Sequence, residues 1–75
     1  MNSHETYLKR LIAEANGALE KANSSADEIK RFYNFSRFLN IIDAIKKEIH
    51  LLESQQYYIP LDIYREALKL LKMVE

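Results

Sequence analysis

The sequence predicts an all-α fold, an antiparallel helical hairpin plus a third C-terminal helix in an arrangement like a three-helix bundle. Apolar residues recur at helical spacing in three segments, and two short polar breaks separate these segments. One glycine and one proline in 75 residues leave little of the turn chemistry that sheets and hairpins need. We expect helices over about 4–22, 26–53 and 60–74, within one helical domain that spans 1–75.

The first predicted helix carries an apolar stripe on one face, with several alanines that would let a neighbouring helix approach closely. The stripe consists of Leu8, Leu11, Ile12, Ala15, Ala18, Leu19 and Ala22. Asn2, followed three residues later by Glu5, is a candidate cap for the start of this helix. Gly17 lies inside the helix at a cost of about 1 kcal/mol relative to alanine. It marks either a close-packing point or, as we favour, a tolerated imperfection.

The second predicted helix follows the polar break 23–25 and presents apolar side chains on two different faces. Ser25 and Glu28 match a capping box, which predicts a start near Ala26. Further on, apolar residues alternate in steps of three and four, the spacing of a coiled-coil seam over two and a half heptads. This seam consists of Phe35, Phe38, Ile42, Ile45, Ile49 and Leu52, and is widened by Leu39 and Ile41. Four earlier residues lie off the seam on a helical wheel, namely Ile29, Phe32, Tyr33 and Ser36. The apolar face therefore rotates near Asn34, because the helix bends there or because its first turns face a different neighbour.

The third predicted helix follows the break 54–59 and begins at Pro60, a residue suited to a first helical turn. Tyr58 is expected to pack on Ile63 as a hydrophobic staple. Two adjacent apolar faces of this helix are broad enough for two neighbours. They consist of Leu61, Tyr64, Leu68 and Leu71 on one face and of Ile63, Ala67, Leu70 and Val74 on the other.

The size of the chain favours association with another protein. A single core below roughly 70–80 residues seldom contributes more than about 3–5 kcal/mol. Cysteine is absent, so disulfides and thiolate metal sites are excluded. We therefore expect a protein partner or self-association, as a homo-oligomer such as a dimer or as a heterocomplex.

Charge and hydropathy exclude further classes of function. Eleven basic and eleven acidic side chains cancel, which disfavours a nucleic-acid binder. No apolar run approaches the roughly 20 residues that span a bilayer, and the N-terminus lacks the apolar core of a signal peptide. A cytoplasmic protein is the expectation.

The sequence contains no motif that supports catalysis, a cofactor or a metal. One glycine rules out a phosphate-binding glycine loop, and neither His-Glu-x-x-His nor Glu-x-x-His occurs. A serine paired with His50 has no supporting spacing. His50 would sense pH if a partner buried it, but an exposed position on the helix flank is favoured. We predict neither an enzyme nor a binder of small-molecule substrates.

The window 30–38 is the most unusual part of the sequence, with four aromatic residues, three basic residues and no acid. It fits core packing, protein recognition through exposed aromatic and arginine side chains, or nucleic-acid stacking, in that order. Tyr57 is a second candidate contact. The predicted partner-binding residues are Phe32, Tyr33, Phe35, Phe38, Ile42, Ile45, Ile49 and Tyr57.

The chain from Ala18 to Glu53 resembles the small co-chaperones of type III secretion needle subunits, which are helical hairpins. The resemblance lies in Ala18-Leu19-Glu20-Lys21, a short polar link, and the segment 30–50 with its aromatic start and isoleucine-rich end. It covers about half the chain and includes no invariant motif. It implies a role in keeping an aggregation-prone needle protein soluble before export. The third helix departs from the shortest members of that family.

We therefore predict a non-enzymatic helical interaction module, most concretely a co-chaperone that binds a second chaperone or a secreted helical subunit. The seam residues of the second helix would bury against a partner helix, because the last two helices carry more apolar side chains than one short chain can cover. Two alternatives are a small bacterial immunity or inhibitor protein that blocks a toxin or receptor, and a nucleic-acid-associated regulator using Lys30, Arg31 and Arg37.

Overall fold

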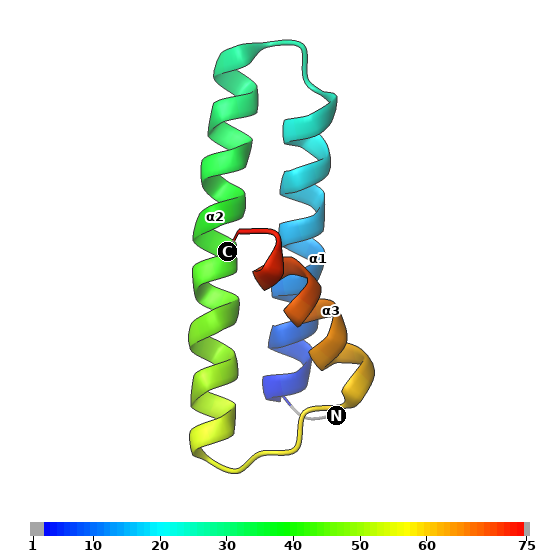
Figure 1. Ribbon diagram of the computed structural model, residues 1–75, viewed down its shortest axis with the longest axis vertical. Helices are drawn as coiled ribbons and strands as arrows, with labels where there is room; N and C mark the ends of the chain where they lie inside the picture. The colour runs from blue at the N-terminus through cyan, green and yellow to red at the C-terminus, as the bar shows by residue number, and fades with distance from the viewer. Residues whose placement is uncertain (1–2, 75) are drawn as a thin grey trace.

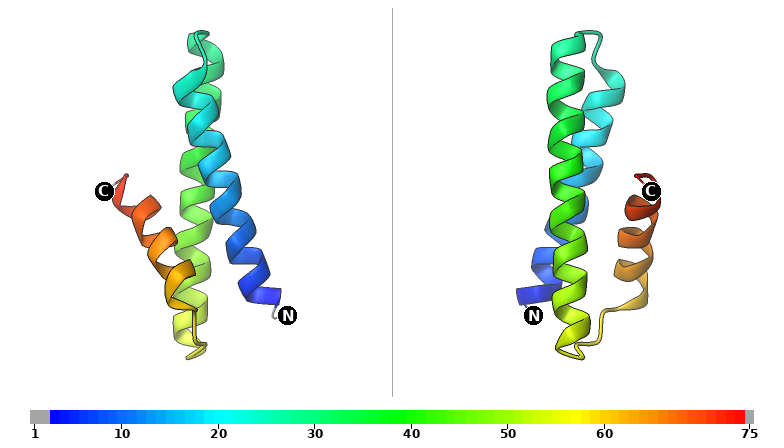
Figure 2. Two further views of the ribbon diagram at one scale, coloured as in Figure 1. Left: turned by 90° about the vertical axis from the view of Figure 1, so that its right-hand side faces the viewer. Right: turned by 60° about the vertical axis from the view of Figure 1, so that its left-hand side comes forward.

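The computed structural model describes residues 3–74 and contains three helices, α1 (Ser3–Ser24), α2 (Glu28–Ser54) and α3 (Leu61–Lys72). Helices α1 and α2 form an antiparallel hairpin, and α3 packs at an angle against the half of the hairpin that lies nearer the end of α2 (Figures 1 and 2). The predicted all-α, three-helix architecture is confirmed.

Helix α1 buries the predicted stripe against α2. Its buried residues are Leu8, Leu11, Ile12, Ala15, Ala18 and Ala22, while Leu19 is partly buried against the same core. Ala15 and Ala18 have no exposed surface. Their small side chains let the backbones of the two helices come close, so that the large side chains of α2 fill the space between them. The predicted cap at Asn2 lies outside the described residues.

Helix α2 contributes the bulk of the core from its second half. Its buried residues are Phe38, Ile41, Ile42, Ile45, Ile49 and Leu52. The seam therefore begins at Phe38, and Phe35, which the spacing placed in it, is half exposed. Helix α2 is continuous through Asn34, whose side-chain amide donates a hydrogen bond to the Lys30 carbonyl at 2.9 Å. The apolar face rotates along one uninterrupted helix, and nothing within residues 3–74 covers Ile29 or Phe32.

The start of α2 differs from the predicted capping box. The helix begins at Glu28, and its cap is Asp27, whose carboxylate accepts hydrogen bonds from the Ile29 and Lys30 amides at 2.9 and 3.5 Å. Ser25 belongs to the turn, because its hydroxyl accepts a hydrogen bond from the Asp27 amide at 3.3 Å. The prediction of Ser25 as the cap was wrong, since a carboxylate two residues later reaches the free amides of the first turn.

The second link changes direction at Gln56, a non-glycine residue with a φ of 55°. Tyr57 and Ile59 then pack on the core, whereas Tyr58 is 78% exposed. The predicted staple between Tyr58 and Ile63 is therefore wrong, because the neighbours of Tyr58 occupy the space against the core. Helix α3 begins one residue after Pro60 and buries Ile63, Ala67 and Leu70.

The short length of α3 determines which part of the hairpin a third helix covers. With 12 residues at about 1.5 Å each, α3 is roughly 18 Å long, whereas the 27 residues of α2 extend for about 40 Å. Helix α3 ends near the middle of the hairpin (Figure 1). The half of the hairpin next to the link 25–27 consequently has only two layers of helix in the described chain.

Gly17→Ala is expected to raise the free energy of unfolding by about 0.5–1 kcal/mol. A Cβ added at Gly17 would meet nothing within 4 Å, so the close-packing interpretation is wrong. The glycine lowers the helix propensity of α1 and raises the conformational entropy of the unfolded chain. Urea unfolding followed by circular dichroism measures the change. Ala13→Gly, at an exposed position of the same helix, is the matched control and should lower stability by about 1 kcal/mol. A destabilised Gly17→Ala protein would contradict the open space around Gly17.

Asp27→Ala is expected to lower the free energy of unfolding by about 1 kcal/mol, because two amides of the first turn of α2 lose their acceptor. Ser25→Ala should cost less than half as much, since its hydroxyl contacts only the turn. The two variants are compared in one set of urea titrations. A larger loss of unfolding free energy for Ser25→Ala than for Asp27→Ala would show that Ser25 is the cap of α2.

Candidate functional site

The first three turns of α2 expose large apolar side chains on a face turned away from the core. Ile29, Phe32 and Tyr33 are 81%, 75% and 66% exposed, and Phe35 and Leu39 are 46% and 40% exposed. We call these five residues the outer stripe. Together these five side chains expose on the order of 600 Å² of surface. This value takes about 150–250 Å² as the area of a fully exposed aromatic side chain. The largest apolar patch on a typical monomer is about 300–600 Å² and is often functional.

The outer stripe ends after Leu39. In the next three turns the same outward face of α2 carries Asp43, Lys46, Lys47 and His50, which are all exposed. Asp43 and Lys47 form an ion pair at 3.0 Å. The outward face is thus apolar beside the two-layered half of the hairpin and mostly charged in the half where α3 packs, where Leu51 is the exposed apolar exception. The exposed position of His50 agrees with the flank position favoured from the sequence.

Basic side chains lie on both margins of the outer stripe. At 100° per residue, Arg37 lies about 40° beyond Tyr33 on one margin, and Arg31 lies about 40° beyond Phe35 on the other. Lys30 follows Arg37 on its margin. No acid occurs between Glu28, at the start of the helix, and Asp43. Within residues 3–74 none of these three cations forms an ion pair, and all three residues are exposed.

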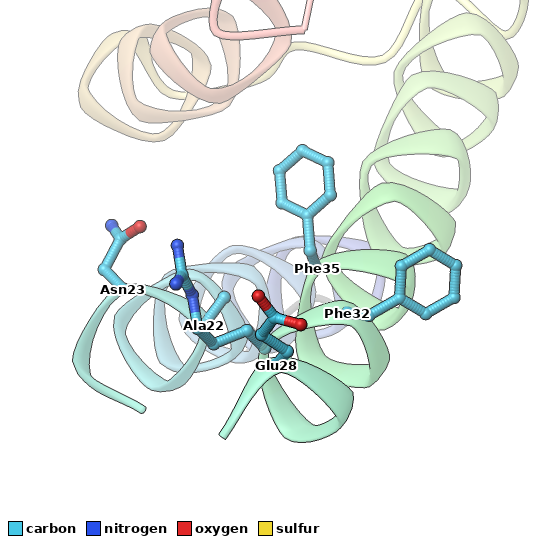
Figure 3. A pocket seen from close by; sticks show the side chains of 6 residues that line it. Ala22, Asn23, Glu28, Phe32 and Phe35 are labelled. Atoms are coloured by element: carbon cyan, nitrogen blue, oxygen red, sulfur yellow. The ribbon is translucent and has the colours of Figure 1, made fainter. Parts of the chain in front are cut away.

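A shallow groove of about 450 Å³ borders the outer stripe where α1 ends and α2 begins. It is lined by Ala22 and Asn23 of α1 and by Glu28, Arg31, Phe32 and Phe35 of α2. Phe35 points toward the side of the hairpin on which α3 lies, whereas Phe32 points away from α1 (Figure 3). The rings of Phe35 and Phe38 stack with centroids 6.1 Å apart, so Phe35 connects the exposed stripe to the core.

The structure divides the eight predicted partner-binding residues into three groups. Phe32, Tyr33 and Phe35 belong to the outer stripe. Phe38, Ile42, Ile45 and Ile49 are buried by the chain's own helices, so a partner cannot reach them in this fold. The prediction that these four side chains pack on a partner helix is corrected accordingly, because α1 and α3 together enclose them.

Tyr57 lies at the other end of α2, far along the chain from the outer stripe. Its amide donates a hydrogen bond to the Leu52 carbonyl at 2.9 Å, and its ring lies 6.0 Å from that of His4. Partly buried against the core, it secures the link to α3 and does not extend the stripe.

Ile29 and Leu39 are the two stripe residues that the predicted binding set lacked. Both were visible in the sequence, Ile29 as a residue off the main seam and Leu39 as one that widened it. The missing signal was tertiary, because the side of α2 on which α1 and α3 pack decides whether these positions are covered.

Among residues 3–74 there is no group of three or more histidine, cysteine, aspartate or glutamate side chains that would hold a metal ion. No helix in the described part of the chain is long and apolar enough to cross a membrane. Near the start of α1, Nδ1 of His4 lies 3.4 Å from Oε1 of Glu48 in α2.

Comparison with family models gives no match, and comparisons with curated proteins and with solved structures give none either. The resemblance to needle-subunit co-chaperones therefore stays a prediction.

Phe38→Ala is expected to lower the free energy of unfolding by about 3–5 kcal/mol, since it opens a cavity between α1 and α2. Phe32→Ala should change it by less than about 0.5 kcal/mol, because its ring is already in solvent. Urea unfolding of both variants separates the core from the stripe on the same helix. A loss above 2 kcal/mol for Phe32→Ala would show that the stripe belongs to the folding core.

Proposed function

We propose that this chain is a non-enzymatic helical module that binds another protein through the outer stripe. The observation that carries the proposal is that Ile29, Phe32 and Tyr33 stand in solvent on a continuous helix whose opposite face completes the core. These side chains add nothing to the enclosed core, so their burial is left to a second molecule. Aromatic and arginine side chains are also the types enriched where proteins bind one another.

The size of the stripe is compatible with binding. Covering about 600 Å² of apolar surface corresponds to roughly 15 kcal/mol of gross hydrophobic free energy. Association costs an estimated 4–15 kcal/mol in lost translational and rotational freedom, before the partner's own apolar surface is counted. The outer stripe is therefore large enough to anchor a complex.

The most concrete form of the proposal follows the resemblance to needle-subunit co-chaperones. The resembling stretch, 18–53, contains the whole outer stripe. In this role the chain would join a second chaperone or a secreted helical subunit and keep it soluble until export. A toxin-protection assay distinguishes this role from that of an immunity or inhibitor protein.

A nucleic-acid-associated role is the second candidate, because the exposed rings of Phe32 and Tyr33 lie beside Lys30, Arg31 and Arg37. Stacking on single-stranded bases uses such a combination. The zero net charge weakens this candidate, since nucleic-acid binding depends on counterion release by a basic surface. Salt-dependent retention on single-stranded DNA would favour it over protein binding.

The double variant Ile29→Ser/Phe32→Ser is expected to lose a protein partner while keeping the fold. The tagged wild-type chain is incubated with extract of its native cell, and bound proteins are quantified by mass spectrometry. At least one protein should fall more than tenfold with the double variant, and the purified pair should reproduce that loss in calorimetry. Tyr58→Ser is the matched control, because it removes an equally exposed aromatic side chain outside the stripe.

Circular dichroism of the double variant must match that of the wild type, which separates loss of binding from loss of fold. If every captured protein binds wild type and double variant equally, the outer stripe is not a protein-binding surface.

A further inference from the structure

The outer stripe has the dimensions of a contact with one helix. From Ile29 to Leu39 it extends over ten residue steps, which is about 15 Å at 1.5 Å per residue. Phe32, Phe35 and Leu39 follow the i, i+3, i+7 spacing with which a helix presents anchors to another helix. The exposed charged residues that follow, Asp43 and Lys46, end the apolar contact. A helix of three to four turns covers this length.

The charges around the stripe indicate the chemistry of that helix. Cations border both margins, with Arg31 on one and Arg37 with Lys30 on the other, and none of them has an ion-pair partner among residues 3–74. A helix lying along the stripe would place the flanks of its own apolar face beside these cations. Acidic flanks would pair with them, whereas basic flanks would be repelled.

The same charges argue against a second copy of this chain as the occupant. A twofold-symmetric contact brings the same patch of both copies together. It would set the acid-free stretch 29–42 of one copy against that of the other, with Arg31 and Arg37 of both copies around one apolar contact. Like charges juxtaposed at an interface cost several kilocalories per mole.

We propose that the outer stripe binds one amphipathic helix of a partner protein, three to four turns long, with acidic side chains on both flanks of its apolar face. This inference rests on the proposed protein-binding function and specifies the partner's chemistry. Phe32, Phe35 and Leu39 supply the apolar anchors. Arg31, Arg37 and Lys30 orient the helix by pairing with its acids.

A displayed peptide library tests the inference directly. Each peptide is an amphipathic helix of about four turns whose apolar positions are leucine, isoleucine, phenylalanine or methionine, and whose flanking positions are glutamate, glutamine or lysine in equal proportion. The library is selected on the immobilised full-length chain. Glutamate should be enriched at the flanking positions on both sides of the apolar face.

Affinity measurements with variants of the chain then test whether the selected peptides bind at the outer stripe. Phe32→Ser/Leu39→Ser should weaken binding more than tenfold. Arg31→Gln/Arg37→Gln should weaken it about three- to tenfold at low salt, with a smaller difference at high salt because exposed ion pairs are screened. Lys69→Gln/Lys72→Gln, which removes two exposed cations from α3, is the matched control and should leave the affinity unchanged.

Four results would overturn the inference: enrichment of glutamine or lysine, binding that survives the stripe variants, a stripe-dependent dimer in light scattering, and stripe-dependent cosedimentation with phosphatidylserine vesicles. Failure of the proposed function has a different signature, because then no protein from the native cell depends on Ile29 and Phe32. If such a protein exists but crosslinks to the stripe through a segment that is not an acidic helix, the inference alone fails.

Discussion

The close packing of α1 on α2 is the contact on which the rest of the structure depends. Ala15 and Ala18 of α1 have no exposed surface, and they allow Phe38 and Ile45 of α2 to fill the space between the two backbones. Larger side chains at the alanine positions would push the helices apart and expose the isoleucines of α2. Helix α3 adds Ile63, Ala67 and Leu70 to a core that the hairpin has already defined.

Because α1 and α3 pack on one side of α2, the two faces of α2 have different surroundings. The inward face, from Phe38 to Leu52, completes the core. The outward face of the first turns carries an apolar stripe that residues 3–74 leave uncovered, because α1 and α3 pack on the other side of α2. Since the two sets of side chains contact different surroundings, substitutions on the outward face can change binding with little effect on folding. Phe35 is the exception, since its ring stacks on Phe38 and belongs partly to both.

Basic and acidic side chains are distributed unevenly along a chain that has no net charge. Eleven basic and eleven acidic residues balance overall, yet the stretch 29–42 contains three cations and no acid. The margins of the stripe are therefore positive although the whole molecule is neutral. Net charge alone would miss this property, because electrostatic complementarity at an interface depends on the local arrangement of charges.

The positions of the helices and most of the core were predictable from periodicity. The apolar stripe of α1 and the seam residues from Phe38 to Leu52 are buried as their spacing requires. Errors arose where a choice depended on one or two local contacts. Asp27 caps α2 in place of Ser25, and Tyr58 turns to solvent while Tyr57 packs on the core. The choice of a cap involves about 1 kcal/mol of local hydrogen bonding, and the choice between the two tyrosines depends on packing within the link. Spacing resolves neither.

The sequence by itself determined that this protein is helical, where its helices lie and that α2 has two apolar faces. These properties follow from local hydrogen bonding and from the 3.6-residue period, which act within a segment. Only the tertiary structure decided which of the two faces is enclosed. Burial depends on the side of a helix against which its neighbours pack: α1 and α3 share one core with Ile42 and Ile49, whereas Ile29, Phe32 and Tyr33 stay in solvent.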